Sequence, residues 1–208
     1  MSYAVKEMFL TLQGEGVRSG RRAVFIRMAG CNLWSGREQD RAGADCTFCD
    51  TDFVGTDGAN GGRYPAAELA AGAAALWGEG EGRLTVVTGG EPLLQLDTAL
   101  IDALHAEGFE IAVETNGTRP APPGLDWICV SPKAGTKVVQ RRGDELKLVW
   151  PQPGIDPEEL LGWDFDHFLI QPMDGPDRAA ATRACIDHVM RNPRWRLSLQ
   201  THKLLGLP

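Results

Sequence analysis

The sequence predicts an α/β protein whose core is an incomplete barrel of about six parallel strands, similar to a TIM barrel with part of its ring missing. Three observations lead to this prediction. Short buried strand patterns alternate with helical patterns or loops, which is typical of parallel sheets. Polar segments with glycine or proline follow strand after strand, and parallel α/β folds build their sites at such strand ends. The strand patterns outnumber the helical patterns about two to one, so the ring is not expected to close.

The N-terminal part of the chain predicts a long β-hairpin that precedes the parallel strands. Residues 3–12 and 23–28 have strand patterns, and the glycine-rich segment 14–20 joins them. Residues 31–62 are rich in glycine, aspartate and threonine and are expected to form a long loop. Residues 65–77 are rich in alanine and begin with proline, which suits the first turn of a helix.

Further along the chain, strands continue to alternate with helices. Helices are predicted at residues 93–107, where apolar residues recur on one face and Gly108 ends the pattern, and at residues 178–191, which Asn192 and Pro193 stop. No internal repeat or linker interrupts the alternation, so we expect one domain over residues 1–208. Strands are predicted at residues 84–87, 109–113, 127–130, 145–149, 167–170 and 195–199.

Composition and charge argue against several classes of protein. Hydrophobic residues make up 43% of the chain and charged residues 24%, as in ordinary soluble globular proteins. The net charge of −7 argues against a general nucleic-acid or membrane-surface binder. No apolar run approaches the roughly 18 residues that span a bilayer, and the N-terminal pattern is not that of a signal peptide. We therefore expect a cytoplasmic protein with no nucleic-acid or membrane partner.

The five cysteines are unevenly placed. Cys31, Cys46 and Cys49 lie in one segment, and in a reducing compartment such a group indicates metal or redox chemistry rather than disulfides. Cys129 and Cys185 stand alone in a strand pattern and a helix pattern, and we expect both to be buried structural residues.

Two kinds of metal site compete for the three grouped cysteines. A zinc site would require a fourth cysteine or histidine at similarly tight spacing, and the nearest histidine, His105, lies far downstream on a predicted helix. An iron–sulfur cluster with one open iron needs only three protein ligands, and we favour this interpretation. A zinc- or iron–sulfur-binding module without catalytic activity is the alternative from a different class.

The segment around these cysteines resembles the cluster loop of the radical S-adenosylmethionine (SAM) superfamily. Residues 25–33 (FIRMAGCNL) and 46–51 (CTFCDT), with aromatic Phe48 between the last two cysteines, resemble its motif, but fourteen residues separate the first two cysteines where three are usual. Lengthening this loop costs about 1.4 kcal/mol. Metal binding contributes on the order of 10 kcal/mol, so the polar insertion at residues 32–45 is tolerable on the surface. The resemblance implies a [4Fe–4S] cluster, with Phe48 and Asp50 near the adenine and ribose of SAM.

A second similarity to this superfamily follows the strand predicted at residues 84–87. Thr88, Gly89, Gly90, Glu91 and Pro92 resemble the turn that receives the methionine amino group of SAM. Glycines let backbone carbonyls approach an ammonium group, and Glu91 could hold the turn or accept a hydrogen bond. By itself such a turn is also a common way to enter a helix.

Other strand ends resemble SAM-binding positions of the same superfamily. Serine, lysine and carboxylate side chains suit the ribose hydroxyls and the methionine carboxylate, and main-chain groups around Gln171 suit adenine. Alternatively, Glu114 or Asp174 could simply cap a loop. These positions are Glu114, Asn116, Ser131, Pro132, Lys133, Gln171, Pro172, Met173 and Asp174.

Both ends of the chain resemble the 7-carboxy-7-deazaguanine synthase family, through residues 11–16 (TLQGEG) and 199–208 (LQTHKLLGLP). Members use a 5′-deoxyadenosyl radical to contract the ring of 6-carboxy-5,6,7,8-tetrahydropterin, with loss of ammonia, in the 7-deazapurine (queuosine) pathway. The resemblance also implies a homodimer and a flavodoxin-type electron donor. The closest alternative, a glycyl-radical enzyme activase, should lack the Gln-Gly-Glu-Gly loop and the C-terminal motif.

The resemblance to this family implies a set of substrate-binding residues. Glu15 and Gln13 would read the amide–amine edge of the pterin, Arg27 would meet its carboxylate, and Thr51 would bind Mg²⁺. Other interpretations are a solvated hairpin loop for residues 13–15, an ion pair at a strand edge for Arg27, a structural hydrogen bond for His202 and an ordinary turn for Thr51. The implied substrate set is Leu12, Gln13, Gly14, Glu15, Arg27, Thr88, His202 and Pro208, the last through a terminal carboxylate.

Overall fold

The computed structural model describes residues 2–208 and is built around one nine-stranded sheet with the order β3-β1-β2-β4-β5-β6-β7-β8-β9. The six pairings from β2–β4 to β8–β9 are all parallel, whereas β1 pairs antiparallel with β2 and β3. The strands are β1 (Tyr3–Leu12), β2 (Arg22–Met28), β3 (Gly62–Tyr64), β4 (Leu84–Gly89), β5 (Glu110–Thr115), β6 (Trp127–Val130), β7 (Arg142–Trp150), β8 (Asp164–Pro172) and β9 (Trp195–Leu197).

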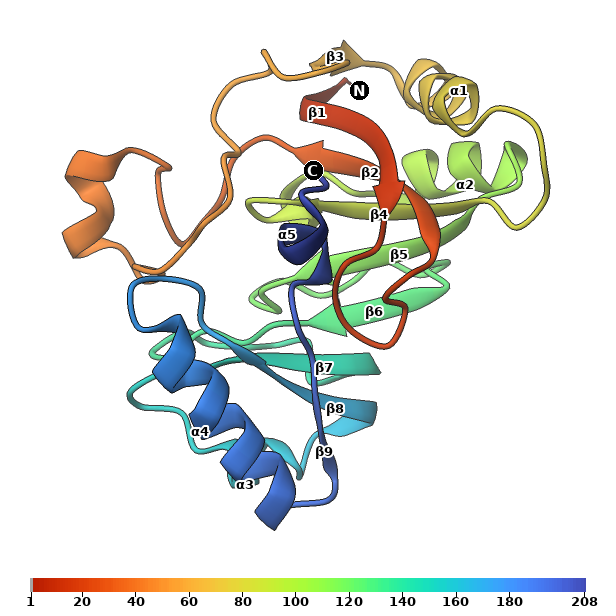
Figure 1. Ribbon diagram of the computed structural model, residues 1–208. Helices are drawn as coiled ribbons and strands as arrows, with labels where there is room; N and C mark the ends of the chain where they lie inside the picture. Colours follow the sequence, from red (N-terminus) through yellow and green to blue (C-terminus); the bar gives the residue numbers. More distant parts are fainter. Residues whose placement is uncertain (1) are drawn as a thin grey trace.

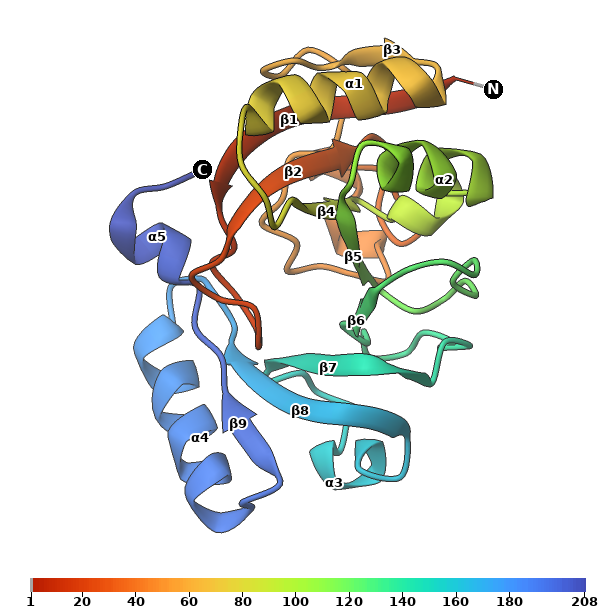
Figure 2. The ribbon, with the colours of Figure 1, turned by 90° about the vertical axis from the view of Figure 1, so that its right-hand side faces the viewer.

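The sheet curves into an arc that does not close, because β3 and β9 are its two edges (Figures 1 and 2). Helices α1 and α2 cover the outer face of the first half and α3 and α4 that of the second half (Figure 2). The incomplete parallel barrel and the N-terminal hairpin expected from the sequence are thus confirmed. The helices are α1 (Ala66–Trp77), α2 (Thr98–Ala106), α3 (Pro157–Leu160), α4 (Arg178–Arg191) and α5 (Thr201–Leu205), with 3-10 turns η1 (Glu38–Gly43) and η2 (Pro92–Leu94).

Alternation within the strands explains how the arc positions a site. In β7, Leu146 and Leu148 are fully buried in the apolar layer under the helices, so the residues between them point to the inner face. The same period of two operates in β2, β4 and β5, where a smaller apolar cluster of Ala23, Leu84, Val86 and Ala112 lies on the concave side. Polar groups such as Lys147 share the concave side with it. Within residues 2–208, no helix is long and apolar enough to cross a membrane.

Several local differences separate the structure from the sequence prediction. The helix predicted at residues 93–107 begins only at Thr98, because the Asp97 carboxylate caps it by accepting from the Leu100 N–H at 3.1 Å. The last strand ends at Leu197 rather than at residue 199. The short β3, α3 and α5 were not predicted, since segments of three to five residues carry no readable periodicity.

The insertion at residues 32–45 lies on the surface, as expected, and none of the residues of η1 is buried. Two apolar side chains anchor it: Leu33 and Trp34 are buried, and Trp34 packs edge-on against Phe53 with ring centres 5.6 Å apart. Arg41 lies over the Trp34 ring at 4.0 Å and donates hydrogen bonds to the carbonyls of Thr47 at 2.9 Å and of Cys49 at 3.1 Å. The insertion therefore supports the cysteine loop from one side.

Candidate active site

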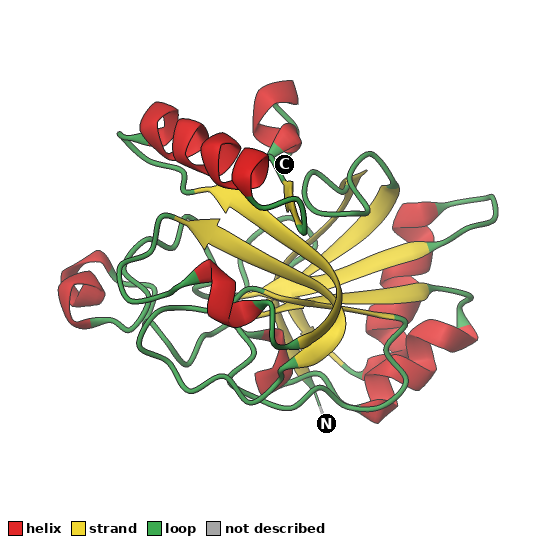
Figure 3. Cartoon of the chain, turned by 90° about the horizontal axis from the view of Figure 1, so that it is seen from below, coloured by secondary structure: helices red, strands yellow, loops and turns green. Residues whose placement is uncertain are grey.

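A pocket of about 450 Å³ lies at the carboxyl ends of the parallel strands, on the concave side of the sheet. Long loops gather beyond this end of the strand layer (Figure 3). The volume is in the range of small-molecule sites. Most of the residues predicted from the sequence line this pocket, and only Leu12, Gly14, Glu91 and Pro132 do not.

The three grouped cysteines line the pocket together. Cys31 follows β2, Cys46 and Cys49 lie further along the same loop, and all three are free thiols. Burial raises the pKa of Cys31 and of Cys46, and the nearby charges of the other thiolates add to this rise, although Lys133 opposes it at Cys46. Within residues 2–208, no three histidine, cysteine, aspartate or glutamate side chains are assembled closely enough to hold a metal ion. The donor set nevertheless fits a thiolate-bound cluster, because three free cysteines from one loop face one cavity.

The glycine turn after β4 packs tightly against the start of the cysteine loop. Gly89 has a φ of 138°, and a Cβ there would lie 2.2 Å from the carbonyl oxygen of Met28. A Cβ on Gly90 would lie 2.7 Å from the Cβ of Cys31. Both positions therefore require glycine for close approach to the neighbouring backbone, a reason that the sequence alone did not indicate.

Glu91 is fully buried below this turn and does not line the pocket. Its carboxylate accepts hydrogen bonds from the Leu93 N–H at 2.9 Å, the Thr115 hydroxyl at 2.7 Å and the Asn116 N–H at 2.8 Å. Burial raises its pKa, while these hydrogen bonds oppose the rise. Of the two roles considered for Glu91, the structure thus places it where it holds the turn, because it ties the end of β4 to the end of β5.

Lys133 and Ser131 lie together after β6. The Lys133 ammonium donates to the Ser131 carbonyl at 2.8 Å and to its hydroxyl at 2.7 Å, and lies 5.8 Å from the centre of the Phe48 ring. Burial lowers the pKa of Lys133, and the thiolate of Cys46 opposes that effect. Pro132 is not part of the pocket lining, and its carbonyl accepts a hydrogen bond from the Gln152 amide.

Two carboxylates predicted to bind SAM share one lysine. Lys203, on α5, forms ion pairs with Asp50 at 2.5 Å and with Asp174 at 2.6 Å. The pKa of Asp174 is lowered, first by the hydrogen bond from Lys203. Gln171 lies nearby and accepts from the Ser198 hydroxyl at 2.8 Å. Lys203 therefore joins the cysteine loop, the loop after β8 and the C-terminal segment.

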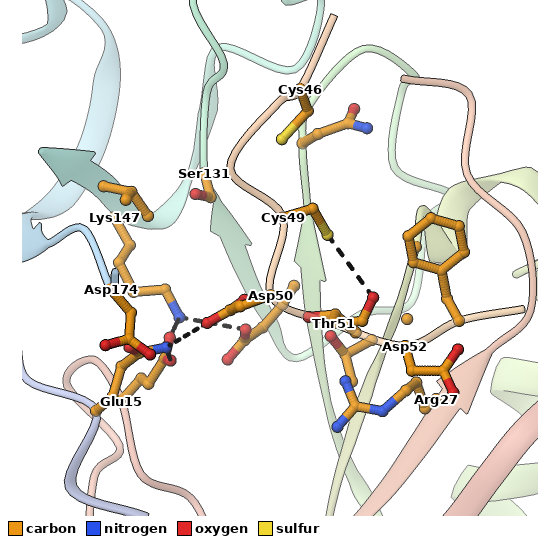
Figure 4. A pocket seen from close by; sticks show the side chains of 18 of the residues that line it. Glu15, Arg27, Cys46, Cys49, Asp50, Thr51, Asp52, Ser131, Lys147 and Asp174 are labelled. Carbon is orange, nitrogen blue, oxygen red and sulfur yellow. Dashed lines mark hydrogen bonds and ion pairs between the residues drawn. The ribbon is translucent and has the colours of Figure 1, made fainter. Parts of the chain in front are cut away.

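A buried charge cluster occupies one end of the pocket (Figure 4). Lys147 lies between two carboxylates, 2.5 Å from Glu15 and 3.2 Å from Glu114. Glu114 also accepts from the Gln13 amide at 2.9 Å, and Glu15 from the Gln200 amide at 2.9 Å. Glu114, predicted as a SAM contact, therefore lies beside two of the predicted substrate residues.

Arg27 and Thr51 lie at the other end of the pocket, with Asp50 between the two ends (Figure 4). The Arg27 Nε donates to Glu7 at 2.7 Å, so the ion pair considered from the sequence exists. A guanidinium carries further N–H groups that can bind a second anion, so this pair and a ligand role are compatible. Asp52, next to Thr51, pairs with Lys6 at 2.9 Å.

Helix α5 and the C-terminus lie on the open side of the arc (Figure 2), and residues of this segment line the pocket. His202 and Pro208 line the pocket, and the Thr11 hydroxyl lies 3.4 Å from the Pro208 carbonyl oxygen. The Thr201 N–H and hydroxyl both donate to the Gly14 carbonyl at 2.9 Å. A Cβ on Gly14 would lie 2.2 Å from Nδ1 of His202, so Gly14 contributes by letting α5 approach rather than by lining the cavity.

Sequence reasoning missed several polar residues of the pocket, among them Lys147, Gln200 and Lys203. A signal for Lys147 was present, because charged residues are rare in the middle of a buried strand unless they are paired. Cys129 and Cys185 are buried as expected, and His105 pairs with Asp126 at 2.9 Å outside the pocket.

Comparisons with known proteins agree with this geometry. The family model described as Radical SAM superfamily matches residues 40–144. The chain is 65% identical over 209 residues to the 7-carboxy-7-deazaguanine synthase of Bradyrhizobium diazoefficiens and 64% identical over 210 residues to that of Caulobacter vibrioides, with 100% of each chain covered. It is also similar to the crystal structure of QueE from Escherichia coli, with a TM-score of 0.73 and 29% identity over 96% of this chain and 94% of that chain.

Proposed function

This chain belongs to the 7-carboxy-7-deazaguanine synthase family of the radical SAM superfamily, and we propose on this basis that it converts 6-carboxy-5,6,7,8-tetrahydropterin to 7-carboxy-7-deazaguanine with release of ammonia. It would act in 7-deazapurine (queuosine) biosynthesis as a carbon–nitrogen lyase. Identity of 64–65% over full length to proteins of this name favours this family over the glycyl-radical activase alternative.

The observation that carries the proposal is that one pocket has two chemically different ends beside the three cysteines. Carboxylate and amide oxygens of Glu15, Glu114 and Gln13 gather at one end, where they can accept from the N–H groups of a pterin. Arg27 lies at the other end, where a guanidinium can bind the substrate carboxylate.

The thiolates of Cys31, Cys46 and Cys49 would hold a [4Fe–4S] cluster, and the cluster together with SAM supplies the radical that removes hydrogen from the substrate. The backbone around Gly89 and Gly90 would receive the methionine amino group of SAM, on a turn held by the buried Glu91. Ser131, Lys133, Asp50 and Asp174 would bind its carboxylate and ribose, and Phe48 and the segment from Gln171 to Met173 would border the adenine.

We further infer that Mg²⁺ binds between Thr51 and the substrate carboxylate. Thr51 lines the pocket at the same end as Arg27, and a hydroxyl oxygen with a carboxylate and waters is an ordinary ligand set for this ion. The neighbouring Asp52 forms an ion pair with Lys6, so we assign the ligand role to Thr51.

The segment from Gln200 to Pro208 would orient the substrate and exclude water. His202 and Pro208 line the cavity, and Lys203 ties this segment to Asp50 and Asp174. Exclusion of water protects reactive intermediates and strengthens polar interactions inside the site. We also propose, from the family resemblance, a cytoplasmic homodimer that receives electrons from a flavodoxin-type protein.

The test is anaerobic turnover of protein reconstituted with iron and sulfide. Incubation with SAM, dithionite, Mg²⁺ and 6-carboxy-5,6,7,8-tetrahydropterin should yield the deazapurine, detected by mass spectrometry, together with one ammonia per product. Cys49→Ala should lose activity and cluster absorbance, whereas Cys185→Ala, a buried thiol outside the pocket, should keep both. Reductive cleavage of SAM without deazapurine would instead assign the chain another substrate.

A further inference from the structure

Lys147 is a buried lysine outside the motifs that carry the family resemblance, and it lies at the end of the pocket that we assign to the pterin. It projects from β7 between Leu146 and Leu148, which are fully buried on the opposite face, and only 3% of its own surface is exposed. Burial of a lysine without a partner is strongly unfavourable, so its surroundings indicate what it does.

The ammonium of Lys147 connects two carboxylates from different parts of the chain. It lies 2.5 Å from Oε2 of Glu15, in the loop between β1 and β2, and 3.2 Å from Oε2 of Glu114, on β5. The other oxygen of each carboxylate accepts from a glutamine amide, Gln200 for Glu15 and Gln13 for Glu114. Each carboxylate is thus fixed at both oxygens, and their remaining lone pairs are available to the pocket that both residues line.

Charges around Lys147 do not balance within the protein. Besides Glu15 and Glu114, a third carboxylate, Glu145, faces it from β7 and accepts from the Val17 N–H at 3.1 Å and the Cys129 thiol at 3.6 Å. The Cys129 thiol stays protonated, because burial raises its pKa well above the ordinary value. Two other cations lie in these surroundings, and each has partners elsewhere. Lys133 donates to Ser131. Arg18 lines a small cavity with Glu15, Glu114 and Glu145 but forms its ion pair with Glu110.

This arrangement determines the protonation states of Glu15 and Lys147. Burial alone would raise the pKa of Glu15, but the charge of Lys147 and hydrogen bonds from Lys147, Gln200 and Gln171 lower it to about 2. Burial lowers the pKa of Lys147, but the carboxylates raise it well above its ordinary value. Both groups are therefore charged at neutral pH, and surplus negative charge faces the pocket, where N–H groups of a ligand can meet it.

We propose that Lys147 is the positioning residue of substrate recognition: it holds Glu15 and Glu114 as a pair of hydrogen-bond acceptors, so that the site selects heterocycles that present adjacent N–H donors. This inference rests on the proposed function. An analogue with acceptors on that edge would face carboxylates with no donor, and such mismatches of buried polar groups are strongly rejected. The role of Lys147 is exerted through the carboxylates and not by contact with the reacting atoms.

The test uses Lys147→Met in the reconstituted holoenzyme under anaerobic conditions. We expect the KM for the carboxytetrahydropterin, and its Kd measured by equilibrium dialysis without reductant, to rise about tenfold or more, with kcat changed less than about threefold. Without the lysine, burial should raise the pKa of Glu15, and the protonated carboxyl would lose an acceptor. Substrate binding by the variant should therefore weaken as pH falls from 8 to 6, whereas binding by the unchanged enzyme should not. The matched control is Tyr3→Phe, which removes an equally buried hydrogen bond, to Asp97, outside the pocket.

A second variant protects the test against simple misfolding. Lys147→Met/Glu15→Gln removes both charges of the pair, so the lysine substitution should raise Kd much less in the Glu15→Gln background than alone. Equal effects in both backgrounds, or a Kd and pH profile of Lys147→Met like those of Tyr3→Phe, would overturn the inference. If the unchanged enzyme makes no deazapurine, the proposed function itself fails, so the two failures are distinguishable.

Discussion

Substitution of Glu91 by glutamine tests whether this residue acts on the SAM site through the backbone. The carboxylate is fully buried and accepts three hydrogen bonds of 2.7–2.9 Å, two on one oxygen and one on the other. In Glu91→Gln one oxygen becomes an NH₂ group. Placing that group toward Asn116 preserves the most bonds, because the other oxygen can still accept from Leu93 and Thr115.

The expected loss of stability in Glu91→Gln follows from these contacts. The Asn116 N–H would lose a hydrogen bond to a charged acceptor and face a second donor, which costs about 2–3 kcal/mol. In a chain of this length each kcal/mol lowers Tm by about 2–4 °C, so Tm should fall by about 4–12 °C. Because the turn that carries Gly89 and Gly90 would shift, the affinity for SAM should fall with it.

The assay is calorimetry of the reconstituted protein under anaerobic conditions, together with the Kd for SAM. Glu79→Gln, an exposed glutamate, is the control and should change neither quantity. An unchanged Tm for Glu91→Gln would refute the hydrogen-bond reasoning. A weaker affinity for SAM at unchanged Tm would assign Glu91 a direct contact with SAM instead.

Three further predictions follow from other contacts. The pKa of Tyr3 is raised to about 12 by burial and by its hydrogen bond to Asp97, so this contribution to stability is complete below pH 10 and is lost as pH rises from 10 through 12. Denaturant unfolding of Tyr3→Phe should lack that alkaline loss of stability. A pH profile identical to that of the unchanged protein would contradict the assignment. Arg41→Met should lower iron retained per chain after gel filtration, because Arg41 supports the cysteine loop, and iron content equal to that of Arg37→Met would show that the support is dispensable. Gly14→Ala should raise the KM for the pterin while reductive cleavage of SAM persists, because the new Cβ would displace His202; an unchanged KM would mean that α5 moves without consequence.

Much of this fold could be predicted because its strands are buried on both faces and are followed by polar turns. The end of β4 at Gly89 and the end of β6 at Ser131 are examples, since a change from β-branched residues to glycine or serine marks a strand end. The short segments β3 and α5 could not be predicted, because tertiary contacts define them. α5, for instance, docks through hydrogen bonds from Thr201 to Gly14.

The candidate site was predictable where a motif is local and not where partners come from distant segments. Spacing alone brings Cys46 and Cys49 together, and both line the pocket. In contrast, Glu114 accepts a hydrogen bond from Gln13 only because β5 and the loop of the first hairpin meet across the concave face. Lys203 is similar, since nothing in its neighbourhood along the chain indicates that it pairs with Asp50.

The docking of α5 on the first hairpin has a consequence for the order of assembly. The hydrogen bond from Thr201 to Gly14 joins residues 187 positions apart, so it closes one of the longest loops in the chain. Contacts between such distant positions form late, and synthesis proceeds from the N-terminus. During translation, the cysteine loop and the strands through β8 are therefore made before the cover, and the open side of the pocket can be covered only once residues 200–208 have followed.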